Sequence, residues 1–144
     1  MHARAADGSG DYGYFDHDAD VGIEGWGESA EAAFVSAARA VFALATDLAS
    51  VRPLQRVEIE FDEADVEIAL VKWLNLLLAH AADRHLALGR FALTRDGSCW
   101  RGEAWGEPWR EGLERGTGVK GATLTSLSVS REGGLWQARC VVDV

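Results

Sequence analysis

Cysteine, histidine and basic residues are scarce in this chain of 144 residues. It contains Cys99, Cys140, four histidines, and 14 lysines and arginines against 23 aspartates and glutamates. Two cysteines without an export signal favour reduced side chains in a cytoplasmic protein. A formal net charge of −9 repels phosphate backbones, and no basic stripe with interleaved aromatic residues is present. Direct binding of RNA or DNA is therefore not expected, although an acidic protein can still dock on a basic protein that holds RNA.

Long apolar runs are also absent. The most apolar stretch, residues 66–82, is interrupted by polar side chains such as Glu67, Lys72 and Asn75. It is too polar for a membrane span, and its pattern is typical of a buried amphipathic helix. Residues 1–11 are small and polar without an apolar core, so they predict a flexible N-terminal tail rather than a secretory signal.

The spacing of apolar residues predicts two helices and several strands. Helical periodicity covers residues 30–46, which follow the N-cap Ser29, and about residues 66–83. The expected extended segments are two between Gly13 and Trp26, followed by residues 56–61, 86–94, 99–105, 119–130 and 135–142. The pairs Asp96-Gly97 and Gly133-Gly134 are hairpin turn signals. This order predicts one α+β domain over residues 12–144, with a mostly antiparallel sheet of about six strands and two packed helices.

The densest polar cluster is the run D-H-D-A-D at residues 16–20. In an extended segment its three aspartates share one face and His17 points to the other. Carboxylates crowded on one face favour a hard cation such as Ca²⁺, Mg²⁺ or Mn²⁺. A solvated turn of acids explains the cluster equally well. An EF-hand is excluded, because its required glycine and glutamate positions hold Val21 and Gly27.

An apolar strand runs to the last residues, R-C-V-V-D-V at positions 139–144. Held in a sheet, it places the α-carboxylate beside Asp143 and supplies two oxygen donors. An ordinary last strand whose acid faces water is the simpler interpretation. Lys120 is a third candidate, because a lysine near carboxylates can pair with them or with a partner, although most exposed strand lysines do neither.

Several motifs follow the order of one known family. Residues 14–23, Y-F-D-H-D-A-D-V-G-I, and then Gly25-Trp26-Gly27, resemble the archease signature, which reads D-H-T-A-D-V followed by A-W-G. The helix opening at Ser29 also resembles that family. Further runs resembling its motifs are W-L-N at 73–75, G-E at 106–107, V-K-G-A-T at 119–123 and V-V-D-V at 141–144.

The resemblance implies a non-enzymatic cofactor of the RtcB-type, GTP-dependent RNA ligase of tRNA splicing, which promotes ligase guanylylation and multiple turnover. It also implies a divalent metal, Ca²⁺ first and Mg²⁺ or Mn²⁺ next. The ligands that it implies are Asp20, Asp143 and the main-chain or terminal carboxylate oxygens of Val144. The expected supporting residues are Asp16, His17, Asp18, which replaces the usual threonine, and Lys120.

Two other functions stay open on the residues alone. A metal-dependent hydrolase would use Asp20 and Asp143 to activate water, with His17 or Lys120 as a base. A chaperone-like interaction protein would instead present a large exposed apolar patch. The sequence contains no phosphate-binding loop and no nucleophile motif, and its histidine spacing does not suit a zinc site.

Overall fold

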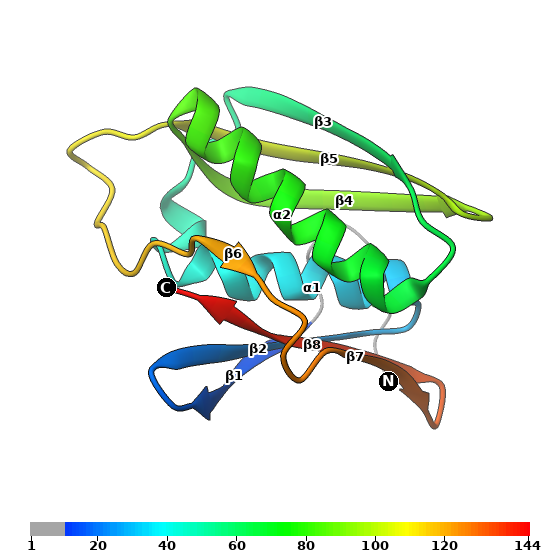
Figure 1. The fold of residues 1–144 in the computed structure, drawn as a ribbon. Helices are drawn as coiled ribbons and strands as arrows, with labels where there is room; N and C mark the ends of the chain where they lie inside the picture. Colours follow the sequence, from blue (N-terminus) through cyan, green and yellow to red (C-terminus); the bar gives the residue numbers. More distant parts are fainter. Residues whose placement is uncertain (1–10) are drawn as a thin grey trace.

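The computed structural model describes residues 11–144, and the expected tail therefore lies outside the described residues except for Asp11. Within residues 11–144 there are eight strands, two α-helices and one short 3₁₀ helix (Figure 1). The strands are β1 Tyr12–His17, β2 Asp20–Gly27, β3 Gln55–Asp62, β4 Leu86–Asp96, β5 Cys99–Pro108, β6 Gly121–Ala122, β7 Ser128–Glu132 and β8 Leu135–Asp143. The helices are α1 Ala30–Ala43, η1 Leu48–Ser50 and α2 Val66–Arg84.

The strands form two antiparallel sheets with α1 between them. Sheet A has the order β1-β2-β8-β6, with β7 also paired to β8, and sheet B has the order β3-β5-β4. Helix α1 contacts β2 and β8 on one side and β4 on the other, while α2 crosses one side of the molecule and contacts strands of both sheets (Figure 1). The last strand of the chain is therefore an inner strand of sheet A.

Helix α1 is buried on nearly every side because it is rich in alanine. Ser29 caps its first turn by accepting a hydrogen bond from the Ala32 amide at 3.0 Å. The helix lies so close to β2 that a Cβ on Gly25 would be 2.3 Å from the Ala37 nitrogen and 2.5 Å from the Ala33 oxygen. Only glycine permits this approach.

The main core joins both helices and sheet B. The Trp73 indole of α2 donates a hydrogen bond of 3.0 Å to the carbonyl oxygen of Phe34 in α1. Phe34 stacks on Trp100 of β5 with ring centroids 5.0 Å apart. Both tryptophans are fully buried, and their contacts hold α1, α2 and sheet B together.

The predicted α+β class with two helices is confirmed, and so are both hairpin turns. Asp96 lies opposite Cys99, and Gly97 between them has a φ of 60°. One predicted element is wrong. Residues 119–130 are not a single strand, because residues 123–127 are irregular between β6 and β7. Thr123 and Thr125 still share main-chain hydrogen bonds with Val141 of β8, but Ser126 has a left-handed φ of 53°.

Both cysteines are free, in agreement with the expected absence of a disulfide. Cys140 is buried in sheet A, and burial raises the pKa of its thiol to about 12. Cys99 lies in sheet B. None of the helices in the described part of the chain is both long and apolar enough to span a membrane.

Candidate functional site

Two aspartates from opposite ends of the sequence meet at one end of sheet A. The antiparallel register of β2 and β8 places Val21 opposite Val142. Continuing it by one residue places Asp20, the first residue of β2, opposite Asp143, the last residue of β8. Residues directly opposite each other project from the same face with Cβ atoms about 5 Å apart. The two carboxylates are therefore neighbours.

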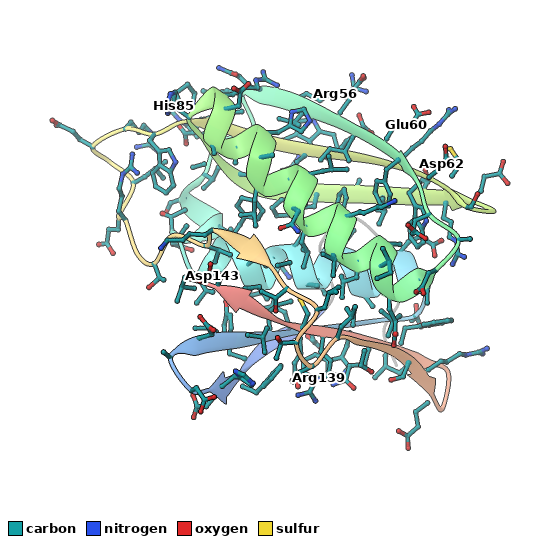
Figure 2. The ribbon with its side chains drawn as sticks, viewed as in Figure 1. Arg56, Glu60, Asp62, His85, Arg139 and Asp143 are labelled. Carbon is teal, nitrogen blue, oxygen red and sulfur yellow. The ribbon has the colours of Figure 1, made fainter. Side chains whose placement is uncertain are left out.

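The same row extends over both flanking strands. His17 of β1 lies opposite Asp20, and Gly121 of β6 lies opposite Asp143. The Lys120 amide donates a hydrogen bond of 2.7 Å to the carbonyl oxygen of Asp143. Figure 2 shows Asp143 at the end of β8, beside β6. Four strands thus align at this end of the sheet, which we call the acidic edge: His17, Asp20, Asp143 and Gly121.

The expected placement of the three clustered aspartates is wrong. Asp18 and Ala19 form the two-residue loop between β1 and β2, so the chain reverses inside the cluster. As a result His17 shares a face with Asp20, while Asp16 projects from the opposite face. Asp18 has a φ of 47°, which aspartate tolerates well and which a β-branched threonine adopts poorly.

The donor set of the acidic edge suits a hard metal that also takes main-chain and water ligands. Within residues 11–144, no three His, Cys, Asp or Glu side chains gather closely enough to hold a metal ion. Two carboxylates leave four or more of the six to eight positions around Ca²⁺ for other oxygens. Val144 follows Asp143 directly, its side chain packs on the core, and its main-chain oxygen is the nearest further donor along the chain.

The two supporting residues at this edge, His17 and Lys120, differ in their burial and contacts. His17 has a buried Nδ1 atom that finds no hydrogen-bond partner among the described residues. It therefore retains a free nitrogen next to Asp20. Lys120 is exposed, and no ion pair within the described part of the chain joins it to Asp20 or Asp143.

The face of sheet A that points away from α1 holds the β1–β2 hairpin against β8. The Phe15 ring covers Gly22 so closely that a Cβ there would lie 2.2 Å from it. Arg139 of β8 places its guanidinium 4.0 Å from the Phe15 ring centroid and 3.5 Å from an oxygen of Glu24. These contacts join the three strands next to the aspartates.

Asn75 is a positioning residue that the sequence did not reveal as such. Its side-chain amide donates to the Ala122 carbonyl oxygen at 3.2 Å and accepts from the Ala122 amide at 2.8 Å. Helix α2 thereby supports β6, whose Gly121 pairs with Asp143. The available signal was a lone amide side chain in an otherwise apolar stretch of helix.

Replacing Asn75 with alanine is expected to loosen β6 and to destabilise the protein by about 1–2 kcal/mol, because the Ala122 main-chain groups lose two partners. Hydrogen exchange should accelerate at the amides of Lys120 and Ala122. His80→Ala on the same helix is the matched control. Unchanged exchange at β6 in the Asn75 variant would contradict this role.

A second polar cluster lies away from the acidic edge, around the buried Glu107. Its carboxylate accepts hydrogen bonds from Arg110 Nε at 2.7 Å and from the Arg52 Nε, Nη2 and main-chain N atoms at 2.9, 2.7 and 2.7 Å. These contacts hold the pKa of Glu107 down at about 2, with Arg110 the larger cause and Arg52 the next. The cluster fastens the segment before β3 and the segment after β5 to each other, which is a structural role.

Comparison with known proteins gives a consistent result. The sequence model of the archease protein family matches residues 12–144. The archease of Sulfolobus acidocaldarius is 38% identical over 134 residues, which are 91% of this chain and 96% of that protein. The archease of Saccharolobus solfataricus is 36% identical over the same shares of the two chains.

Two solved structures share the fold. The solution structure of protein 1598 from Methanobacterium thermoautotrophicum has a TM-score of 0.76 and 29% identity, covering 92% of this chain and 98% of its own. The crystal structure of an archease from Thermotoga maritima, described as a possible chaperone, has a TM-score of 0.64. It covers 90% of this chain and 94% of its own, and at 19% identity it supports the fold alone.

Proposed function

This chain belongs to the archease family, and from that membership we propose that it is a metal-binding, non-catalytic activator of an RtcB-type RNA ligase. In this proposal it acts in the cytoplasm, promotes guanylylation of the GTP-dependent ligase and sustains its multiple turnover in tRNA splicing. The observation that supports it is the β2–β8 register, which pairs Val21 with Val142 and, continued by one residue, brings Asp20 and Asp143 to the same end of sheet A. These two residues lie in the first and last motifs that the chain has in common with the family.

The proposed metal ligands are Asp20, Asp143 and the main-chain oxygen of Val144. Oxygen donors favour Ca²⁺, with Mg²⁺ and Mn²⁺ as alternatives. The chemistry that a metal supplies here is neutralisation of two adjacent carboxylates and coordination positions for a partner's oxygen atoms. His17 supports Asp20 from the neighbouring strand.

The charge of the chain supports an indirect role in RNA metabolism. With a formal net charge of −9, it is repelled by RNA and attracted to a protein with a basic RNA-binding surface. The protein is therefore proposed to dock on the ligase rather than on its substrate. The acidic edge is the part of sheet A that faces the ligase in this proposal.

The test is guanylylation of the purified ligase with radiolabelled GTP, with and without this protein. Stimulation is expected with the metal-loaded protein and is expected to fall after chelation, then to return with Ca²⁺, Mg²⁺ or Mn²⁺. A ligase that is equally active in every arm would overturn the proposal. Phosphoester hydrolysis by this protein without the ligase would instead support the metal-dependent hydrolase.

A further inference from the structure

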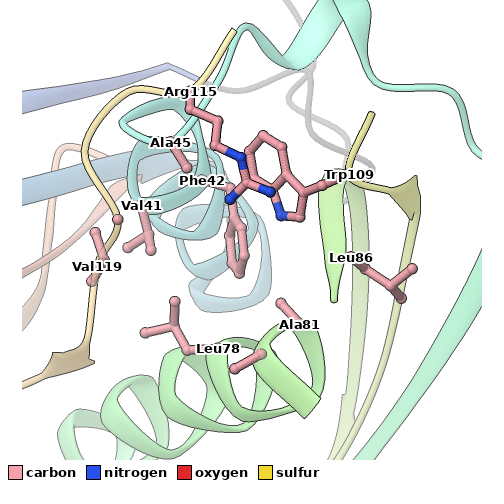
Figure 3. Close-up of a pocket in the computed structure, with 11 residues that line it drawn as sticks. Val41, Phe42, Ala45, Leu78, Ala81, Leu86, Trp109, Arg115 and Val119 are labelled. Carbon is pink, nitrogen blue, oxygen red and sulfur yellow. The ribbon is translucent and has the colours of Figure 1, made fainter. Parts of the chain in front are cut away.

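An apolar pocket opens between the C-terminal ends of the two helices and the segment that follows β5. Its volume is about 240 Å³. Phe42 of α1, Leu78 of α2 and Val119 form much of its wall (Figure 3). None of the lining residues in the described part of the chain carries a carboxylate, so these residues offer dispersion contacts and no acidic partner.

The mouth of the pocket is shaped by a stacked pair of side chains. The Arg115 guanidinium lies 4.2 Å from the ring centroid of Trp109, and both line the opening (Figure 3). The main chain around them is tied down, because the Gly116 amide donates to the Ala45 oxygen at 2.7 Å and the Trp109 amide donates to the His85 oxygen at 3.2 Å. The pocket is therefore formed before any ligand arrives.

The pocket adjoins the acidic edge. Val119 lines it, and the next residue, Lys120, donates its amide hydrogen to the Asp143 carbonyl oxygen. Residues 119–120 therefore link the pocket to the end of β8 through the main chain, while the Asp143 side chain projects from the face of sheet A that points away from α1.

The cations at this surface have no acidic partner in the described part of the chain. Neither Arg115 nor Lys120 forms an ion pair within residues 11–144, although the whole chain has 23 acidic residues against 14 basic ones. By charge complementarity, the matching surface carries a carboxylate close to the group that enters the pocket.

From this geometry we infer that the pocket receives an aromatic side chain of the RNA ligase, with a carboxylate of the same ligase segment on Arg115. An engineered cavity of about 150 Å³ in another protein admits benzene, so the present volume accommodates an aromatic ring. Aromatic anchors in preformed pockets dominate many interfaces. The inference rests on the proposed function, and it names the anchor contact of that partner.

Filling the pocket from its rim tests the inference. Ala82 is exposed on α2 and lines the pocket, whereas Ala79 is exposed on the same helix outside that lining. Ala82→Phe is expected to raise the Kd for the purified ligase at least about 30-fold, as loss of an anchor does. Ala79→Phe, the same change three residues away, is expected to stay within about threefold. Melting curves of both variants establish that they fold.

Reversing the charge at the mouth of the pocket tests the second contact of the inference, the ligase carboxylate on Arg115. Arg115→Glu is expected to raise the Kd about tenfold or more at low salt and to flatten its salt dependence. Arg131→Glu, an equal charge change at an exposed position of β7, is the control.

The outcomes separate the two proposals. If the unaltered protein neither binds nor stimulates the ligase, the proposed function and the pocket assignment both fail. If it does both, but Ala82→Phe and Ala79→Phe bind equally, only the pocket assignment is overturned. Loss of self-association in Ala82→Phe, with ligase affinity unchanged, would assign the pocket to a second copy of this chain and also overturn the inference.

Discussion

Replacing Glu107 with alanine is expected to lower the melting temperature at pH 7 by roughly 10 °C or more. The side chain is only 1% exposed and is the shared acceptor of Arg52 and Arg110. Without it, the Arg52 guanidinium and amide lose their shared acceptor beside a new cavity, and Arg110 keeps only its bond to the Ser50 carbonyl oxygen. Glu103→Ala, which removes a half-exposed carboxylate of the same strand, is the control and should have little effect, because ion pairs near the surface contribute little.

Glu107 also predicts how stability depends on pH. Its pKa falls from an ordinary 4.5 to about 2 on folding, so the unfolded chain binds more protons between these values. The stabilisation is complete above about pH 5 and is lost as the pH falls toward 2. Glu107→Gln removes this titration. Urea unfolding at several pH values should show the gap between the two proteins narrowing on acidification. A gap that stays constant from pH 7 to pH 3 would contradict the assignment.

Asp143→Asn and Asp20→Asn are each expected to reduce ligase stimulation to the level of the ligase alone. An amide keeps the shape of the carboxylate but removes the charge that a divalent metal requires. Asp62→Asn, which removes an exposed acid on sheet B, should stimulate like the unaltered protein (Figure 2). If both folded variants at the acidic edge stimulate fully, the proposed metal site is wrong.

The same variants can also be tested without the ligase, by measuring their thermal stability. Like charges directly opposite each other in a sheet are destabilising, so in chelator each asparagine variant should be as stable as the unaltered protein or slightly more stable. Added Ca²⁺ should raise the melting temperature of the unaltered protein and leave that of the variants unchanged. This pattern separates metal binding from a purely structural effect.

Local signals in the sequence predicted local structure well. Ser29 as a helix cap and the glycine turns near Gly97 and Gly133 depend only on neighbouring residues, and the structure confirms them. The turn at Asp18 was only one of two alternatives for the acidic cluster, because its two-residue loop contains no glycine or asparagine. Because the chain reverses there, His17 and Asp20 share a face of the sheet, and the simple alternation expected for one extended segment does not apply across the turn.

Residue patterns along the chain could not predict which distant strands pair with each other. The sequence alone left Asp20 and Asp143 as separate acids, and only family resemblance joined them before the β2–β8 register brought their positions to the same end of sheet A. The burial of Glu107 was also not predictable from the sequence alone. Alternation along β5 directs it to the face of Trp105, and its burial depends on arginines that approach from segments outside that strand.

The position of β8 has a consequence for how the protein is made. Leu135–Asp143 fills an inner place in sheet A, between β2 and the short strands β6 and β7. On the ribosome, the β1–β2 hairpin must therefore wait for nearly the whole chain before β8, the second partner of β2, emerges, whereas β3, β5 and β4 can pair earlier. Such distant pairings slow folding. A nascent chain released before Leu135 would have neither a closed sheet A nor Asp143, so incomplete products carry no acidic edge to compete for the partner.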